Sequence, residues 1–220
     1  MSEPRVSYRE SIRAAAEAEG RFIQQTGGHG QYGVVDLAVE PFPNEEEDHL
    51  VFEDETKGGA IPKEFIRDVE AGLREAALSG VLAGYQVINV RVRLTDGKYH
   101  EVDSSDLAFR AAGSIAFKEA VRKAGLYLLE PIMDLEVVVP EEYMGGVLKD
   151  LQSRRVEIKD LGWRGHLRVI SAKAPLAEMF GYATVVRSLS QGRASYTLAP
   201  SSYAEVPANR QKEILSRYGL

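Results

Sequence analysis

The chain has 220 residues, of which 44% are hydrophobic and 27% are charged, and its formal net charge is −6. These fractions are typical of a water-soluble globular protein, and the length suits one large domain or two of ordinary size. No run of about 18 apolar residues predicts a membrane span, and the first twenty residues lack the apolar core of a signal peptide. The chain has no cysteine, which excludes disulfides, thiol catalysis and cysteine-built zinc sites. A cytoplasmic location fits these features.

A negative net charge argues at first against a nucleic-acid partner, because phosphate binding usually requires a positive surplus. The charge is unevenly distributed, however. The segment from Glu40 to Glu55 holds eight acidic residues and no Lys or Arg, so the rest of the chain carries about +2. We interpret this acidic run as a solvated surface hairpin. Contact with RNA elsewhere in the chain remains compatible with the composition.

The first 95 residues are predicted to form mostly strands, with one helix. Strands are expected over Glu19–Gln25 and 31–40, the second because its apolar residues alternate. The glycine-rich segment 26–30 forms a turn between them. A helix is expected to open at Pro62 and to run through Ser79, where Gly80 stops it.

The next segments are predicted to form a strand, a turn and a second helix. Residues 85–95 alternate between apolar and polar side chains, which predicts a strand with one buried face. Asp96-Gly97 is expected to be a turn, followed by the short segment 98–102. One of the polar residues at 103–105 is expected to cap a helix that ends at Gly125.

A second domain is predicted to begin at about residue 129, which divides the chain into domains 1–128 and 129–220. The elements expected in it are a strand over 132–139, a helix over 141–153, strands over 155–161 and 166–174 around a turn at 162–165, a helix from Pro175 to about Ser190, and a strand over 193–206. This β-α-β-β-α-β order is that of a ferredoxin-like fold. A short helix over 207–218 closes the predicted second domain.

Three longer motifs carry a resemblance to a known family. They are Gly27-Gly28-His29-Gly30-Gln31-Tyr32-Gly33 preceded by Tyr8-Arg9-Glu10, then Tyr99-His100-Glu101-Val102-Asp103-Ser104-Ser105 followed by Leu107-Ala108-Phe109, and finally Leu129-Glu130-Pro131-Ile132-Met133 with Pro140-Glu141-Glu142-Tyr143-Met144-Gly145. In sequence, order and spacing they resemble the C-terminal two domains of elongation factor G, the family of bacterial-type ribosomal translocases.

The resemblance implies an α+β chain in which a domain similar to domain 2 of ribosomal protein S5 is followed by a ferredoxin-like domain. It implies that the first enters the decoding site of the small ribosomal subunit, with 16S rRNA, tRNA and mRNA as partners. The second is expected at the factor-binding region of the large subunit. A monomer without a membrane partner is expected.

Nucleotide chemistry is not expected of this chain, which contains no Gly-x-x-x-x-Gly-Lys-Ser/Thr phosphate loop. We therefore expect no enzymatic activity and no cofactor here, and GTP and magnesium would belong to a GTPase domain outside it. The chain is accordingly expected to be a piece of a longer protein.

The resemblance places the candidate RNA-binding residues in two loops; they are Gly27, Gly28, His29, Gly30, Gln31, His100 and Asp103. Glycines allow close approach to an RNA backbone, and the Gln31 amide can both donate and accept hydrogen bonds. The alternative is a tight hairpin that uses glycine for its geometry alone. His29 stands where the family usually has arginine, so a phosphate contact there is expected to be weaker or pH-dependent.

The second loop offers a histidine and a set of helix-capping residues. His100 matches the family's histidine, and a neutral imidazole can stack on a base or bond to a phosphate, beside which it becomes a cation. Residues 103–105 have a simpler explanation as helix caps, with direct RNA contact as the alternative. His29, His100 and Asp103 would suffice chemically as metal ligands, but nothing in their spacing requires it, and no metal is expected.

Three other functions share features with this sequence. Some small-molecule kinases share the S5-like architecture, but the glycine-rich loop here leads into a strand and does not open a helix that would hold phosphate. Within the family, a ribosomal protection protein of the tetracycline-resistance type shares the domain plan, and the loop sequences favour the translocase over it. A paralogous factor acting in ribosome recycling stays open, because the sequence does not separate recycling from translocation.

Overall fold

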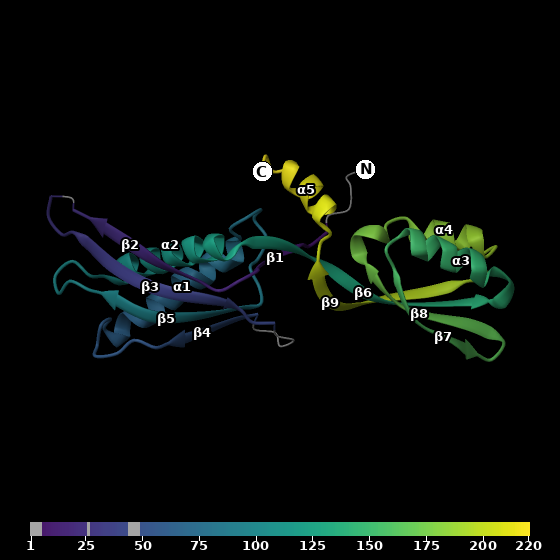
Figure 1. Ribbon diagram of the computed structural model, residues 1–220, viewed down its shortest axis with the longest axis horizontal. Helices are drawn as coiled ribbons and strands as arrows, with labels where there is room; N and C mark the ends of the chain where they lie inside the picture. Colours follow the sequence, from purple (N-terminus) through teal and green to yellow (C-terminus); the bar gives the residue numbers. More distant parts are fainter. Residues whose placement is uncertain (1–5, 26, 44–48) are drawn as a thin grey trace. The chain divides into compact units, whose positions relative to one another are not determined.

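The computed structural model describes residues 6–25, 27–43 and 49–220, and it is a mixture of helices and strands in two compact units (Figure 1). Among the described residues, the N-terminal unit consists of those within 9–128 and 207–220, and the C-terminal unit of 129–206 together with residues 6–8. The strand β6 (Leu126–Pro140) passes from one unit into the other. Within the described residues, no helix is long and apolar enough to cross a membrane.

The closing helix α5 (Ala208–Ser216) belongs to the N-terminal unit, whereas the sequence assigned it to the second domain. Two contacts explain the difference. The Gln211 side chain is buried and its Oε1 accepts a hydrogen bond from the backbone N–H of Leu128 at 3.2 Å. The Tyr218 ring packs edge-on against Tyr85, with ring centroids 6.0 Å apart, and the two hydroxyls are hydrogen-bonded. A helix pattern in the sequence does not identify the partner of the helix.

The N-terminal unit is a four-stranded sheet covered on one face by two helices (Figure 1). The strand order is β2 (Ala16–Gln24), β3 (Gln31–Pro41), β5 (Val90–Lys98) and β4 (Leu50–Asp54), in which only the β4–β5 pair is parallel. The short strand β1 (Arg9–Ile12) pairs with β6. The helices α1 (Lys63–Ser79) and α2 (Asp106–Ala124) agree with the predicted helices.

Two glycines allow α2 to lie unusually close to its neighbours. A Cβ at Gly20 of β2 would stand 2.2 Å from the carbonyl oxygen of Ala112, and a Cβ at Gly72 of α1 would stand 1.9 Å from that of Arg110. Any side chain at either position would therefore push α2 away. The core beneath the helices includes Leu37, Leu73, Val92, Phe109 and Phe117, all fully buried.

The strand β5 differs from its prediction at both ends. Residues 85–89 precede it and run beside β1, where Val87 bridges to Glu10, and the backbone of Asn89 has a positive φ of 60°. At the other end, Asp96 and Gly97 continue the strand where a turn was predicted. The pairing with β3 shifts register between Asp36, which pairs with Asp96, and Leu37, which pairs with Leu94, so Thr95 forms a β-bulge next to the Asp-Gly pair.

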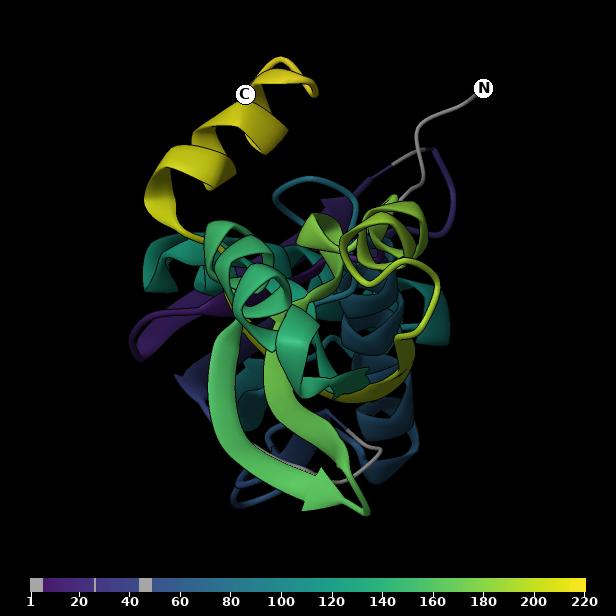
Figure 2. The ribbon, with the colours of Figure 1, turned by 90° about the vertical axis from the view of Figure 1, so that its right-hand side faces the viewer.

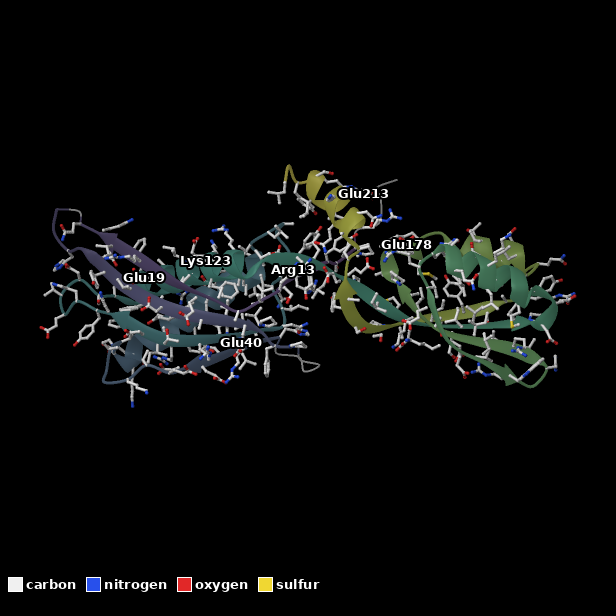
Figure 3. All side chains as sticks on the ribbon, in the orientation of Figure 1. Arg13, Glu19, Glu40, Lys123, Glu178 and Glu213 are labelled. Carbon is white, nitrogen blue, oxygen red and sulfur yellow. The ribbon has the colours of Figure 1, made fainter. Side chains whose placement is uncertain are left out.

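The acidic run is largely structured in its described part, contrary to its interpretation as a solvated hairpin. Its later residues form β4, and Glu53 pairs with Arg91 at 2.7 Å. Glu40, labelled in Figure 3, lies 3.5 Å from Arg91, and Glu55 lies 3.3 Å from Arg93. Arginines on the neighbouring strand therefore neutralise part of the run, a pairing that no local pattern predicts. Residues 44–48 of the run lie outside the described residues.

The C-terminal unit confirms the predicted β-α-β-β-α-β order. Its sheet has the order β9 (Ser195–Glu205), β6, β8 (Leu167–Pro175) and β7 (Glu157–Arg164), with every pair antiparallel. The helices α3 (Glu141–Ser153) and α4 (Tyr182–Leu189) lie together on one face of the sheet (Figures 1 and 2). The core between these helices and the sheet contains Leu135, Val137, Leu151, Ile170 and Tyr182.

Two local predictions in this unit were wrong in detail. The helix expected from Pro175 is interrupted: a single 3-10 turn (Leu176–Glu178) is followed by Gly181, whose φ of 77° ends the first turn before α4 begins. The turn between β7 and β8 is confined to Gly165 and His166, so Gly162 and Trp163 belong to β7.

Two buried glutamates come from the family motifs, one in each unit. The Glu10 side chain is fully buried, and its carboxylate accepts four hydrogen bonds of 2.7–3.0 Å from the backbone N–H groups of residues 81, 82, 83 and 85. Glu130 is equally buried and receives two bonds from the Arg155 guanidinium, at 2.9 and 3.3 Å. Arg155 also donates to Glu178, labelled in Figure 3, at 3.0 Å.

Candidate RNA-binding tip

Both candidate loops lie at the same end of the N-terminal unit (Figure 1). The cause is the strand order: β3 pairs with β2 on one side and with β5 on the other, both antiparallel. The loop that enters β3 and the loop that leaves β5 must therefore meet at one edge of the sheet. We call residues 27–32 and 99–105 together the tip. The structure thus brings together the two segments that the sequence singled out.

Asp103 of the second loop holds the first loop in place. Its Oδ1 accepts a hydrogen bond from the backbone N–H of Gly30 at 3.2 Å, and its backbone carbonyl accepts one from the N–H of Tyr32 at 2.9 Å. A Cβ at Gly30 would stand 3.1 Å from both the carboxylate carbon of Asp103 and the carbonyl oxygen of Gln24, so a larger residue would require these groups to shift. The carboxylate that was considered as an RNA ligand therefore has a structural partner inside the protein.

Two serines complete the connection between the loops. Ser105 is the N-cap of α2: its Oγ accepts a hydrogen bond from the N–H of Ala108 at 3.1 Å and donates to Oε1 of Gln31 at 2.6 Å. Ser104 Oγ donates to the carbonyl of Tyr32 at 2.9 Å. Of the three predicted capping residues, Ser105 is the cap. The Gln31 amide oxygen is engaged within the tip, which leaves its NH₂ group to act as a donor.

His100 lies at the outer part of the second loop, with its side chain 54% exposed. Its Nδ1 accepts hydrogen bonds from the backbone N–H groups of Val102, at 3.3 Å, and of Asp103, at 3.2 Å. Its ring stands 6.0 Å from the ring of Tyr32, tilted by 50°. The imidazole is thus held by its own loop while its other edge remains available to a partner.

The outermost part of the first loop offers little charge. Gly27, Gly28 and His29 are exposed, and Gly30 and Gln31 are half-buried. The structure brings His100 and Asp103 together but gives His29 no part in that pair. Across residues 6–25, 27–43 and 49–220, no three His, Asp or Glu side chains are grouped so that they could hold a metal ion.

Sequence reasoning missed the exposed apolar residues around the second loop. Tyr99 is 44% exposed, Val102 is 68% exposed, and Leu107 in the first turn of α2 is 59% exposed. Large apolar side chains at a loop end are usually turned inward, so their exposure here favours contact with a partner. Their position within the second motif was visible in the sequence, but their exposure follows only from the fold. Rings and apolar groups of this kind can pack against unstacked bases.

The sheet behind the tip carries an acidic group. Asp36 of β3 has its pKa raised, first by burial and then by the neighbouring carboxylates of Glu19 and Asp96. Glu19 is labelled on β2 in Figure 3. Such a cluster repels phosphate, so an RNA partner is more easily accommodated at the tip than along this part of the sheet.

Comparison with known proteins agrees with this architecture over nearly the whole chain. Residues 4–125 match the family described as elongation factor G, domain IV, and residues 127–214 match the family described as elongation factor G C-terminus. Elongation factor G of Thermotoga maritima is 57% identical over 215 residues, which is 98% of this chain and 31% of the relative. That of Aquifex pyrophilus is 53% identical, over 98% of this chain and 30% of the relative.

A solved structure of a protein from Thermus thermophilus superposes with a TM-score of 0.91 and 44% sequence identity, covering 99% of this chain and 32% of that one. A domain IV unit followed by the factor's C-terminal domain defines the C-terminal part of a translation elongation factor. The chain belongs to the elongation factor G family. It spans about a third of the length of the curated relatives that it matches, 31% in the case of Thermotoga maritima. The resemblance seen in the three motifs is thereby confirmed, as is the two-domain α+β fold.

Proposed function

We propose that the chain is the part of a ribosomal translocase whose tip enters the decoding site of the small subunit and promotes GTP-dependent movement of tRNA and mRNA. The observation that carries this proposal is the junction of the two tip loops, with Asp103, Ser104 and Ser105 bonded to the first loop. GTP binding and hydrolysis would reside in a domain outside this chain, because the sequence contains no phosphate loop.

The work proposed for the tip is steric and polar, and no covalent chemistry is asked of it. Loops joined by side-chain hydrogen bonds move as one body, so they can occupy a vacated site and oppose backward slippage of RNA. The exposed glycines permit close approach to a sugar-phosphate chain, and the His100 ring can contact a base or a 2′-hydroxyl. We further propose that the C-terminal unit binds the factor-binding region of the large subunit, and that the factor acts as a cytoplasmic monomer.

The first test replaces tip residues in the full-length factor. Gln31→Ala and His100→Ala should each slow single-round translocation by about tenfold, because each removes one or two hydrogen bonds worth about 1 kcal/mol apiece. GTP hydrolysis should be unchanged. Gln152→Ala, at an exposed position on α3, is the matched control and should leave both rates unchanged. Unchanged translocation in folded tip variants would argue against the tip assignment.

The second test adds the 220-residue chain itself to ribosomes. Without a GTPase domain the chain should bind weakly and should support no multiple-turnover translocation. Robust translocation in the presence of this chain alone would contradict the proposed division of labour between tip and GTPase domain.

A further inference from the structure

We propose that the second tip loop fixes His100 as a neutral imidazole with its proton on Nε2, so that the residue acts on its partner as a hydrogen-bond donor and not as a cation. The use of that donor at RNA rests on the proposed function. The protonation state itself is a property of the isolated chain and can be tested without ribosomes.

Backbone hydrogen bonds to Nδ1 determine which ring nitrogen of His100 carries the proton. Two backbone N–H groups, those of Val102 and Asp103, point at this nitrogen from 3.3 and 3.2 Å. A backbone N–H can only donate, so Nδ1 must accept and its lone pair must be free of a proton. In a neutral imidazole the single proton then belongs to Nε2. The tautomer follows from main-chain geometry and does not depend on a flexible side chain.

One neighbouring group, the carboxylate of Asp103, favours a proton on Nδ1. The carboxylate Oδ2 of Asp103 lies 3.7 Å from Nδ1, and a protonated imidazole would be attracted to it. That separation exceeds a hydrogen bond, and the other oxygen of the same carboxylate already accepts the N–H of Gly30. A proton on Nδ1 would point toward two N–H groups, which lie closer to Nδ1 than the carboxylate does and would repel it. The two donors therefore decide the state of the ring.

The loop is closed on itself in a way that holds this arrangement. The N–H of His100 donates to Ser104 Oγ at 2.8 Å, and the N–H of Ser104 donates to the carbonyl of His100 at 3.0 Å. The same Ser104 hydroxyl donates to the carbonyl of Tyr32 in β3. Ser104 is thus a positioning residue for the imidazole, and it ties the ring to the sheet.

A fixed Nε2–H donor selects a particular class of partner. It requires an acceptor, such as a 2′-hydroxyl oxygen, a base nitrogen or carbonyl, or a phosphate oxygen bound without neutralisation of its charge. Substitutions of His100 that each supply one property of the ring distinguish a donor at Nε2 from a donor at Nδ1 and from a cation. A glutamine amide nitrogen reaches the place of Nε2, an asparagine reaches that of Nδ1, and a lysine supplies a cation.

The protonation state is measured by ¹⁵N NMR of the histidine rings in the 220-residue chain at neutral pH. The sequence has four histidines, and the spectrum of His100→Gln assigns the signal of His100. His166, exposed in the turn between β7 and β8, provides a second histidine signal in the same spectrum for comparison. We expect His100 to show an unprotonated Nδ1 and a protonated Nε2. Shifts averaged between the two tautomers, a protonated Nδ1, or a doubly protonated ring would each overturn the proposal.

The use of the donor is measured by translocation with the full-length factor. His100→Gln should stay within about threefold of the unaltered factor, whereas His100→Asn and His100→Lys should fall to the rate of His100→Ala. A lysine variant that equals or exceeds the glutamine variant would overturn the donor role. If all four variants translocate normally while NMR shows the expected tautomer, the proposed function of the tip fails and only the protonation state stands. Melting curves of each variant exclude loss of fold as the cause.

Discussion

The tip and the two buried glutamates come from the same family motifs but serve different ends. Glu10 directly follows Tyr8-Arg9, and Glu130 lies in the Leu-Glu-Pro motif; both side chains are almost completely buried. The side chain of His100, by contrast, is 54% exposed. A shared sequence motif therefore contains residues that build the scaffold and residues that face a partner, and burial separates the two groups.

The two glutamates also differ from each other in how the buried charge is satisfied. Glu10 uses the backbone N–H groups of a loop, so it organises residues 81–85 around itself. Glu130 uses the guanidinium of Arg155, a residue whose own backbone has a positive φ of 57°. Paired burial of this kind is costly to disrupt, because removing one partner leaves the other without compensation.

The largest loss of stability is expected from Glu10→Ala, which would leave four loop N–H groups without their acceptor. We expect the free energy of unfolding of the N-terminal unit to fall by about 3 kcal/mol or more. Urea unfolding followed by circular dichroism measures this loss. Trp163 is the sole tryptophan and lies in the C-terminal unit, so its fluorescence reports that unit separately.

Glu75→Ala is the matched control for this prediction. Glu75 is exposed on α1 and pairs with Arg110 at 2.8 Å. Exposed pairs contribute little, so we expect a change of less than about 1 kcal/mol. If Glu10→Ala cost no more than Glu75→Ala, the distinction between the scaffold glutamate and the surface residues would be lost.

A smaller effect is expected from Ser105→Ala within the tip. The substitution removes the N-cap of α2 and the bond to Gln31, at a cost of about 1 kcal/mol. For a chain of this size the melting temperature should fall by about 2–4 °C. Ser114→Ala, in the middle of the same helix, should change it little. Equal melting temperatures for both variants would show that the two loops are not joined through Ser105.

The smallest effect is expected from Asp36→Asn, and its sign depends on pH. Because the pKa of Asp36 is raised in the folded state, ionisation of the carboxyl group favours the unfolded chain. The stability associated with this group is present at low pH and is lost as pH rises through the folded-state pKa. At neutral pH the variant should therefore be more stable, by no more than about 0.5 kcal/mol. The advantage should shrink as pH approaches about 4.

Melting curves at several pH values measure that difference. Asp54→Asn provides the comparison, because Asp54 is exposed and accepts hydrogen bonds from Thr56. Replacing it should not stabilise the protein at neutral pH. If Asp36→Asn were less stable than the unaltered protein at neutral pH, the ionised Asp36 would not be disfavoured by burial and its neighbouring carboxylates.

Local patterns alone determined much of this protein. The helices from Lys63 and Asp106 begin and end where Pro62, Ser105, Gly80 and Gly125 indicate, because capping and helix termination depend on residues adjacent in the chain. The β-α-β-β-α-β order of the second unit follows from the same short-range signals. The family motifs identified which loops to examine.

Only the tertiary structure decided which residues meet. The partner of α5, the pairing of the acidic run with Arg91 and Arg93, and the bulge at Thr95 all depend on strands or helices far apart in sequence. The tertiary structure likewise decides the different roles of two tip residues: Asp103 bonds to Gly30 inside the protein, while His100 remains exposed. Contacts between distant segments are set by packing and by the need to pair buried polar groups, and a one-dimensional pattern does not contain them.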